Sequence, residues 1–295
     1  MIRKTEQAGI LILEEPENAL PVIFDSPHSG TAYPDDFNYN CDLNDLKRVE
    51  DTYVDELFSK APHYGAALLC AQFPRSYIDV NRAVTDIDEL LMHEPWPSEQ
   101  LNPIAPTERS KAGIGLISRL IKPGKAIYNN KLTPDTIMHR IKTYYEPYHD
   151  TLRTLLDDAY EHHGQFWHVN CHSMPASTAY PKQNRYNKPS DIVLGTNDGQ
   201  SCSKEFVYTL RAFWEKRGYR VTINDPFKGV ELITRYAQPT QGKNSIQIEI
   251  NRGLYMDEKT REKNANCAKL KQDCTDMIRL CCDHARQNQI PMAAD

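Results

Sequence analysis

Apolar residues along the chain fall into short continuous runs that alternate with longer stretches of helical spacing. The short runs predict strands, which we place at residues 22–25, 66–70, 76–80, 166–171, 191–194, 219–223 and 245–250. The helical spacing predicts helices, which we place at residues 42–57, 137–160, 206–218 and 259–287. Because strands alternate with helices through most of the chain, we expect an α/β fold with a mixed, mainly parallel sheet flanked by helices.

Two segments interrupt this alternation. Pro147 lies inside the helical stretch at 137–160 and should kink that helix or divide it in two, and Gly164 is placed to end it. Residues 86–132 are rich in proline and glycine and show little periodicity. We therefore predict a long excursion beside a functional site, since long irregular segments often carry function.

The composition is that of an ordinary globular protein, with 40% hydrophobic and 25% charged residues in a chain of 295. No repeat or linker divides it, so we expect one α/β domain over residues 1–295. The net charge of −5, without a basic block, argues against a nucleic-acid partner, and no apolar run is long enough to cross a membrane. The first residues lack the apolar core of a signal peptide, so we expect a cytoplasmic protein.

The chain has eight cysteines, and none of them forms the C-x-x-C spacing of a zinc ribbon. Cys267, Cys274 and Cys281 recur every seven residues in the last predicted helix. Because cysteines on one helical stripe behave as small hydrophobic residues, we predict that these three lie in the core.

Two histidines stand at the ends of predicted strands. His28 follows the first run in Ser26-Pro-His-Ser-Gly30, and His172 follows the run at 166–171. Ligands bind at the carboxyl ends of strands in α/β sheets, so both are candidate metal ligands or proton carriers. Their wide separation along the chain leaves two alternatives open, which are one shared metal site or two independent buried histidines.

A zinc site with two histidines usually adds a carboxylate and keeps a fourth position for water. The nearest candidates are Glu50, Asp51 and Asp55. In one continuous helix, Asp51 and Asp55 would share the face opposite the apolar residues, and this favours a solvated acidic face. Asp51 could bind metal only if that face looks into a cleft, or if a new helix begins near it.

Glu249 lies in the predicted strand at 245–250, where three isoleucines alternate with polar residues. The alternation places Glu249 on the face opposite the isoleucines. A carboxylate in this position is either a hydrogen-bonded structural group or a general base, which would take a proton from water and pass it to a leaving amine.

Arginines supply a third kind of candidate. Arg75 and Arg82 flank the predicted strand at 76–80, and the pair Asn81-Arg82 at its end is suited to grip a substrate carboxylate. Arg235 is a second candidate for the same task. An exposed arginine needs no binding function, so these arginines are either substrate-binding residues or ordinary surface residues, and both interpretations stay open.

Together these segments resemble the N-formylglutamate amidohydrolase (formylglutamate deformylase) family. The matching segments occur in order between residues 21 and 258, at 26–30, 50–55, 77–82, 113–115, 147–149, 172–175, 226–229 and 247–250. The family is distantly similar to zinc carboxypeptidases and aspartoacylases. The resemblance therefore implies a fold of the zinc-carboxypeptidase or phosphorylase-hydrolase type and one zinc ion (Zn²⁺) per chain.

The resemblance also implies ligands for this zinc ion. His28 and His172 match the two histidine ligands. Asp51 is our choice for the carboxylate, although the relatives place theirs at the position of Thr31. Asn170 stands where we expect an aspartate in the family, and this exchange should weaken the orientation of His172.

Catalytic and binding roles follow from the same resemblance. Glu249 matches the catalytic glutamate, and Arg75 matches the arginine that stabilises the oxyanion. Asn81-Arg82 match the pair that holds the substrate carboxylate. Val230 replaces an expected glycine, and a bulkier loop there would change which acyl group fits.

The implied reaction is the hydrolysis of N-formyl-L-glutamate, an acidic small molecule, to formate and L-glutamate, as a step of histidine degradation. Two rivals stay open. The same groups would serve a metal-dependent amidohydrolase of another N-acyl amino acid or a small peptide. A non-catalytic protein would instead bind an acidic metabolite through the arginines without turnover.

Overall fold

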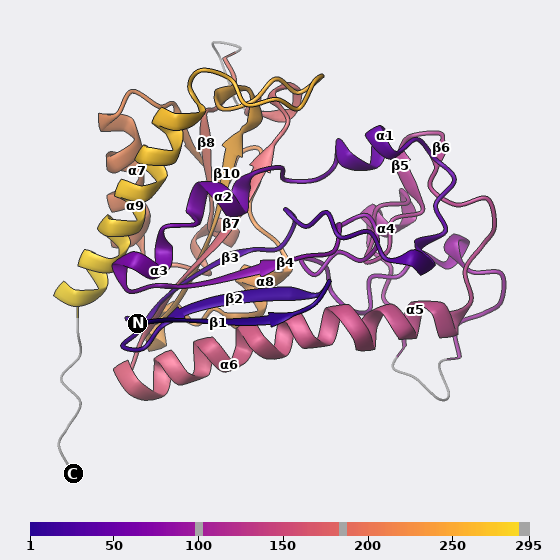
Figure 1. Cartoon of the computed structure of the whole chain (residues 1–295), viewed down its shortest axis with the longest axis horizontal. Helices are drawn as coiled ribbons and strands as arrows, with labels where there is room; N and C mark the ends of the chain where they lie inside the picture. Colours follow the sequence, from indigo (N-terminus) through magenta and orange to yellow (C-terminus); the bar gives the residue numbers. More distant parts are fainter. Residues whose placement is uncertain (98–102, 183–187, 289–295) are drawn as a thin grey trace.

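A sheet of eight strands forms the centre of the protein (Figure 1), whose computed structural model describes residues 1–97, 103–182 and 188–288. The strands lie in the order β1-β2-β4-β3-β7-β10-β8-β9. Their bounds are Ile2–Gln7 (β1), Leu11–Pro16 (β2), Val22–Ser26 (β3), Ala67–Ala71 (β4), Phe166–Met174 (β7), Ile192–Gly195 (β8), Val221–Ile223 (β9) and Lys243–Asn251 (β10). The pairs β4–β3, β3–β7, β7–β10 and β8–β9 are parallel, so the predicted mixed, mainly parallel sheet is confirmed.

Helices cover both faces of the sheet (Figure 1). Their bounds are Leu43–Lys47 (α1), Val54–Phe58 (α2), Ala61–Tyr64 (α3), Glu108–Lys111 (α4), Pro134–Arg140 (α5), Glu146–His163 (α6), Lys204–Lys216 (α7), Glu231–Tyr236 (α8) and Cys267–Gln287 (α9). Helices α2, α7 and α9 pack over a core that contains Phe24, whereas α5 and α6 pack over a core that contains Ile23. Because side chains alternate along a strand, β3 contributes to both cores.

Helix α9 buries the cysteine stripe. Cys267, Cys274 and Cys281 all lie in the core that α9 shares with the sheet, which confirms their predicted position. Like the other described helices, α9 does not combine the length and the apolarity needed to cross a membrane.

An N-terminal hairpin precedes the strand that we predicted as the first. Strands β1 and β2 pair antiparallel, and β2 joins the sheet through β4. All six side chains of β1 are exposed at the edge of the sheet. Its sequence therefore has no apolar alternation, and the hydrophobic pattern could not reveal it.

Further elements differ from the prediction. Residues 76–80 form turns rather than a strand. Tyr77, Ile78 and Val80 are apolar because they are buried in the core under α5 and α6, not because they pair with another strand. Helix α9 begins later than predicted, since residues 259–266 form turns and a β-bridge, and helix α8 was not predicted.

The helix predicted at 42–57 is two helices. Asp42 caps α1 as expected, but the chain leaves the helical path before α2 begins. In between, the Asp51 N–H donates a hydrogen bond of 3.0 Å to the carbonyl oxygen of His28. Residues 48–53 therefore run as a loop toward the end of β3, and this is the fresh helix start that a metal-binding Asp51 required.

Helices α5 and α6 form one long rod (Figure 1), joined by a π-helical turn over Ile141–Tyr145. Pro147 lies in the first turn of α6, directly after this wide turn. Proline lacks an N–H, and in a regular helix its ring clashes with the carbonyl four residues earlier, so a wider turn accommodates it. The predicted kink or division thus takes the form of a π-helical turn just before Pro147, within a continuous rod, and Gly164, at a φ of 67°, ends α6 as predicted.

The predicted excursion at 86–132 is confirmed for the residues that the structure describes; residues 98–102 lie outside them. It carries only short elements, namely α4, a 3-10 turn, and a small sheet of β5 (Leu120–Lys122) and β6 (Lys125–Ala126). Several of its side chains, including Arg109 and Ile114, line a cavity at the edge of the central sheet.

Gly30 permits a close approach where the chain leaves β3. A Cβ atom at this position would overlap the backbone of Gln72 and Phe73. We predict that Gly30→Ala lowers the free energy of unfolding by about 1–3 kcal/mol, the usual cost of overpacking, as measured by urea denaturation. Gly253→Ala is the matched control, because the nearest atoms to its new Cβ lie at 3.3 and 3.7 Å, and it should change stability by less than about 0.5 kcal/mol. Equal stability of the two variants would contradict the close approach.

Candidate metal centre and active site

The parallel strands β3, β7 and β10 end at one edge of the sheet and carry polar side chains there. His28 follows β3, His172 lies near the end of β7, and Glu249 lies near the end of β10. The register pairs Glu249 directly with His172, and side-chain alternation turns the β10 isoleucines into the core. The pairing of the strands thus brings these three residues to one cavity.

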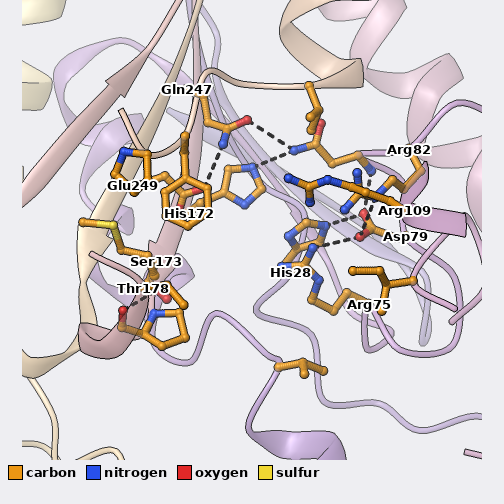
Figure 2. A pocket seen from close by; sticks show the side chains of 18 of the residues that line it. His28, Arg75, Asp79, Arg82, Arg109, His172, Ser173, Thr178, Gln247 and Glu249 are labelled. Carbon is orange, nitrogen blue, oxygen red and sulfur yellow. Dashed lines mark hydrogen bonds and ion pairs between the residues drawn. The ribbon is translucent and has the colours of Figure 1, made fainter. Parts of the chain in front are cut away.

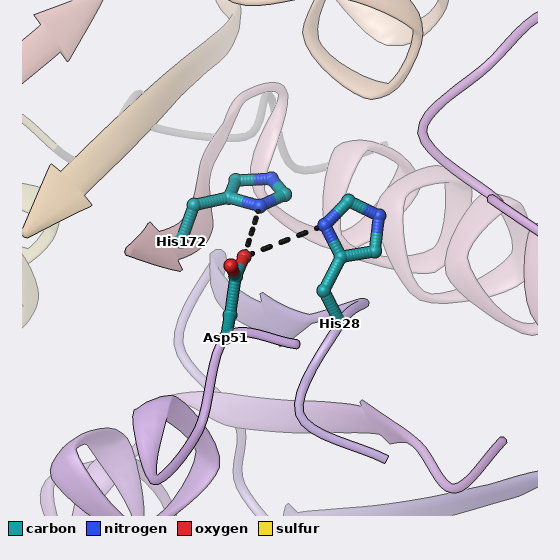
Figure 3. A group of neighbouring side chains, drawn as sticks. All are labelled: His28, Asp51 and His172. Carbon is teal, nitrogen blue, oxygen red and sulfur yellow. Dashed lines mark hydrogen bonds and ion pairs between the residues drawn. The ribbon is translucent and has the colours of Figure 1, made fainter. Parts of the chain in front are cut away.

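His28, Asp51 and His172 form a cluster whose ligand atoms lie within 4.8 Å of one another (Figure 3). Asp51 Oδ2 lies 2.9 Å from His172 Nδ1 and 3.4 Å from His28 Nδ1. All three side chains are buried. Two imidazole nitrogens and one carboxylate form a common protein ligand set for zinc with an open fourth position.

The hydrogen bonds of the His28 ring leave one nitrogen free for a metal. His28 Nε2 lies 2.7 Å from Asp79 Oδ1, and this carboxylate holds the ring proton on Nε2. His28 Nδ1 is buried and has no hydrogen-bond partner in the described part of the chain. A buried polar atom without a partner is rare in native proteins, and a metal ion among the three ligand atoms would satisfy it. The residues therefore fit a divalent metal.

Asp51 is held as an anion by its neighbours. Burial opposes its ionisation, but the neighbouring rings of His172 and His28 and the charge of Arg75 outweigh burial and hold the pKa of Asp51 well below its usual value. Arg252 Nη2 donates to the other oxygen, Oδ1, at 2.9 Å, and Arg252 is itself buried. Asp51 thus presents one oxygen to an arginine and the other to the two histidines.

The other two candidate carboxylates have different surroundings. Glu50 accepts hydrogen bonds from Tyr33 and Arg261, and Asp55 lies in the first turn of α2, outside the cluster. The sequence pattern favoured a solvated acidic face for Asp51. That interpretation is wrong, because the loop at 48–53 replaces the helix and buries both Glu50 and Asp51.

The nitrogen of His172 that points away from the cluster, Nε2, still has a hydrogen-bond acceptor, although position 170 is an asparagine. Asn170 Oδ1 lies 2.6 Å from His172 Nε2, so that Nδ1 faces Asp51. We predicted that this asparagine would weaken the orientation of His172. The amide oxygen instead supplies the acceptor that we expected from a carboxylate.

Glu249 borders the cavity beside the cluster and is only 7% exposed. Gln247 Nε2 donates a hydrogen bond of 2.8 Å to Glu249 Oε1. Burial raises the pKa of Glu249 above its usual value; His172 opposes this rise, and Asp51 adds to it. A carboxylate with a raised pKa beside a metal site has the properties of a group that accepts a proton and later returns it.

Arg75, Arg82 and Arg109 gather on the side of the cavity that His28 borders (Figure 2). Asp79 accepts a hydrogen bond of 2.8 Å from Arg75 Nη2 and lies 3.8 Å from Arg82 Nε. Within the described residues, Arg82 Nε is buried without a hydrogen bond, and the Arg109 guanidinium has no ion-pair partner. Arg82 and Arg109 are thus available to a bound anion.

Two predicted substrate-binding residues are less suited to that task. Asn81 lines the cavity, but its Oδ1 accepts from the Leu232 N–H at 3.0 Å. Arg235 does not line the cavity; α8 directs it to Tyr145 and Glu231 instead. The position of Arg235 therefore does not support its predicted role in binding the substrate carboxylate.

The cavity has a volume of about 560 Å³, which is within the range of small-molecule sites. Besides the polar groups, it has apolar lining from the end of β7 and from the loop at 226–230. Met174, Phe227 and Val230 contribute to this part. The substitution of valine for an expected glycine therefore lies in the wall of the cavity.

Asp79, Arg109 and Arg252 also belong to the site, although the sequence pattern did not single them out. The signal for Asp79 was its place in the singled-out segment 77–82, where a charge stands among buried apolar residues. Arg252 directly follows β10 and gives a similar signal. Arg109 lies in the irregular excursion, where no periodicity could mark it.

Comparisons with known proteins agree with the resemblance read from the sequence. The chain matches the family model described as N-formylglutamate amidohydrolase over residues 20–256. It is 25% identical to an N-formylglutamate deformylase from Pseudomonas putida, over 84% of this chain and 86% of that protein. The crystal structure of an N-formylglutamate amidohydrolase from Ralstonia eutropha JMP134 is 41% identical, with a TM-score of 0.89 over 95% of this chain and 99% of that one. A gene product from Agrobacterium tumefaciens shares the fold, at 16% identity and a TM-score of 0.63 over 95% of this chain and 96% of that one.

We predict that metal affinity depends on the cluster. His28→Ala and His172→Ala should each lower the affinity for Zn²⁺ by at least about 100-fold, because each removes a ligand rather than an outer hydrogen-bond partner. Competition with a chromophoric chelator measures this affinity. His139→Ala removes an exposed histidine outside the cluster and is the matched control. Equal affinity of His28→Ala and the control would exclude the cluster as the metal site.

Proposed function

Because this chain belongs to the N-formylglutamate amidohydrolase family, we propose that it hydrolyses the amide bond of N-formyl-L-glutamate to formate and L-glutamate. The observation that carries the proposal is one cavity that joins a metal-ligand cluster, a buried glutamate and two available arginines. The proposal includes a place in histidine degradation and a cytoplasmic location, as the family resemblance and the sequence lead us to expect.

We further propose that His28, Asp51 and His172 hold one zinc ion through the atoms that converge in the cluster. Bound there, zinc would supply Lewis-acid polarisation of the amide carbonyl and would lower the pKa of water. The ligands are oriented from outside, since Asp79 holds the His28 ring and Arg252 holds Asp51. Such outer contacts keep ligand atoms pointed at the metal.

Glu249 would take the proton from the attacking water and return it to the amide nitrogen as the C–N bond breaks. Its position beside His172 in the strand register and its raised pKa support this role. Arg75 lies 3.8 Å from Asp51 and is one-quarter exposed. It would donate a hydrogen bond to the oxyanion that develops on the substrate.

The glutamate part of the substrate would lie on the side of the arginines. Arg82 and Arg109 would bind its carboxylates, because Arg109 has no ion pair within the described residues and Arg82 has only a long one of 3.8 Å to Asp79, whereas Arg75 lies 2.8 Å from Asp79. Asn81 would contribute a hydrogen bond to a substrate carboxylate from its side-chain nitrogen. This nitrogen lies at the wall of the cavity, 3.1 Å from His172 Nε2.

We predict that Glu249→Gln keeps its zinc and loses turnover. The amide preserves the shape of the side chain but cannot carry the proton, so kcat should fall by about 10²–10⁴-fold. Formate release from N-formyl-L-glutamate measures the loss, and metal analysis checks the zinc content. Glu231→Gln is the control, since Glu231 pairs with Arg235 outside the cavity. Wild-type turnover by Glu249→Gln would remove Glu249 from the mechanism.

Substrate recognition gives a second prediction. Arg82→Ala and Arg109→Ala should each raise KM for N-formyl-L-glutamate by about 10–100-fold, as expected for the loss of a charged hydrogen bond. Arg235→Ala is the matched control and should leave KM unchanged, because that arginine does not line the cavity. If Arg235→Ala raised KM and Arg109→Ala did not, the assignment of the carboxylate site would be wrong.

A larger N-acyl amino acid is the second candidate substrate. A cavity of about 560 Å³ is of the size that holds drug-sized ligands, which are larger than N-formyl-L-glutamate. Val230 also changes the wall at a position where the family is expected to have glycine. A higher kcat/KM for the N-acetyl than for the N-formyl derivative would favour this candidate, whereas binding of both without turnover would favour a non-catalytic protein.

A further inference from the structure

A buried carboxylate outside the cavity lies two hydrogen bonds away from the metal cluster. Asp25, on β3, is fully buried. Its Oδ1 accepts from His168 Nε2 at 3.0 Å and from Asn170 Nδ2 at 2.8 Å, and its Oδ2 accepts from the Tyr148 hydroxyl at 2.7 Å. Burial opposes ionisation, but His168 and the hydrogen bonds outweigh it and hold the pKa of Asp25 below its usual value. Asp25 is therefore a carboxylate that only accepts hydrogen bonds.

This acceptor fixes the orientation of the neighbouring amide. Asn170 must turn its NH₂ group toward Asp25, and its Oδ1 then faces His172 Nε2 at 2.6 Å. An amide oxygen only accepts, so His172 carries its proton on Nε2. With its Nε2 proton held by Asn170, His172 can release the Nδ1 proton that faces Asp51 at 2.9 Å and offer that nitrogen to a metal ion.

A second side-chain amide, that of Asn81, contacts His172 Nε2 as well and has the opposite effect on the position of the ring proton. Asn81 Oδ1 is occupied by the Leu232 N–H at 3.0 Å, so its Nδ2 must face His172 Nε2, at 3.1 Å. A donor at this place favours a His172 ring with its proton on Nδ1, which cannot bind a metal. The contact with Asn170 is the shorter of the two, and it depends on Asp25.

We propose that Asp25 is a positioning residue that, through Asn170, selects the His172 tautomer whose Nδ1 is free for a metal. The inference rests on the proposed metal centre for its functional meaning. It also accounts for the asparagine at position 170, because the negative charge that we expected there stands one hydrogen bond further from the ligand.

Asp25→Asn tests the proposal, because it keeps the shape of the side chain and removes the obligate acceptor. Zinc affinity, measured by chelator competition, should fall by about 10–100-fold, the usual effect of losing an outer partner of a ligand. In the metal-free protein, the ¹⁵N chemical shift of His172 Nε2 should change from that of a fully protonated nitrogen to that of a partly deprotonated one.

Tyr148→Phe is the matched control. It removes the hydrogen bond to Asp25 Oδ2 and leaves the contact between Asp25 and Asn170 in place. The variant should lose stability but keep the zinc affinity and the His172 tautomer of the wild type. A merely structural role of this buried network would instead give Tyr148→Phe and Asp25→Asn the same loss of zinc affinity.

A double variant tests the direction of the effect. Asp25→Asn combined with Asn170→Asp moves the carboxylate next to His172, where it accepts from Nε2 directly, and zinc affinity should recover. Asn170→Ala leaves Asp25 with its two other partners and should lose affinity as Asp25→Asn does. It provides the test if Asp25→Asn does not fold.

Unchanged zinc affinity and an unchanged tautomer in Asp25→Asn and Asn170→Ala would overturn the proposal. A wild-type protein that binds no zinc would instead defeat the proposed metal centre. In that case, the tautomer of His172 in the metal-free variants would still decide whether Asp25 sets it. None of these measurements requires turnover, so the inference and the proposed reaction can fail separately.

Discussion

The buried charge of Asp51 is the constraint on which the rest of the site depends. An uncompensated carboxylate in a protein interior costs several kcal/mol, and Asp51 is fully buried. Arg252 meets one of its oxygens, and the rings of His28 and His172 meet the other. Each partner comes from a different part of the chain, so the charge is compensated only when β3, β7 and β10 are paired. The loop at 48–53 must also leave the helical path, because a continuous helix would hold Asp51 in another direction.

The parts of the site that could be predicted from the sequence are those that the sheet alone determines. An apolar run followed by a polar residue marks the end of a buried strand, and parallel strands end at a common edge. His28 and His172 were found in this way, and the register of β7 and β10 places Glu249 beside His172. Alternation along β10 was equally informative, because it separates the isoleucines in the core from the polar side chains at the cavity.

The parts that could not be predicted depend on contacts between distant segments. Hydrophobic spacing reports that a residue is buried, not what it meets, so the buried turns at 76–80 looked like a strand. The choice among the three carboxylates depends on the path of the loop at 48–53, where the Asp51 N–H donates to the His28 carbonyl, and no local pattern contains this contact. Arg109 and Arg235 are chemically alike, and only the path of the excursion and of α8 decides which one reaches the cavity.

The charges around the cavity connect substrate recognition with the metal centre. Arg75, Arg82 and Arg109 carry three positive charges, and Asp79 carries one negative charge, which leaves two positive charges on this side. The proposed substrate has two carboxylates, so its charge matches. Asp79 Oδ1 meets His28 Nε2, and Asp79 Oδ2 meets Arg75. A bound substrate that draws Arg82 away from Asp79 would leave more of the Asp79 charge to the His28 ring, and a more basic imidazole is a better metal ligand. One carboxylate thus couples the two ends of the site.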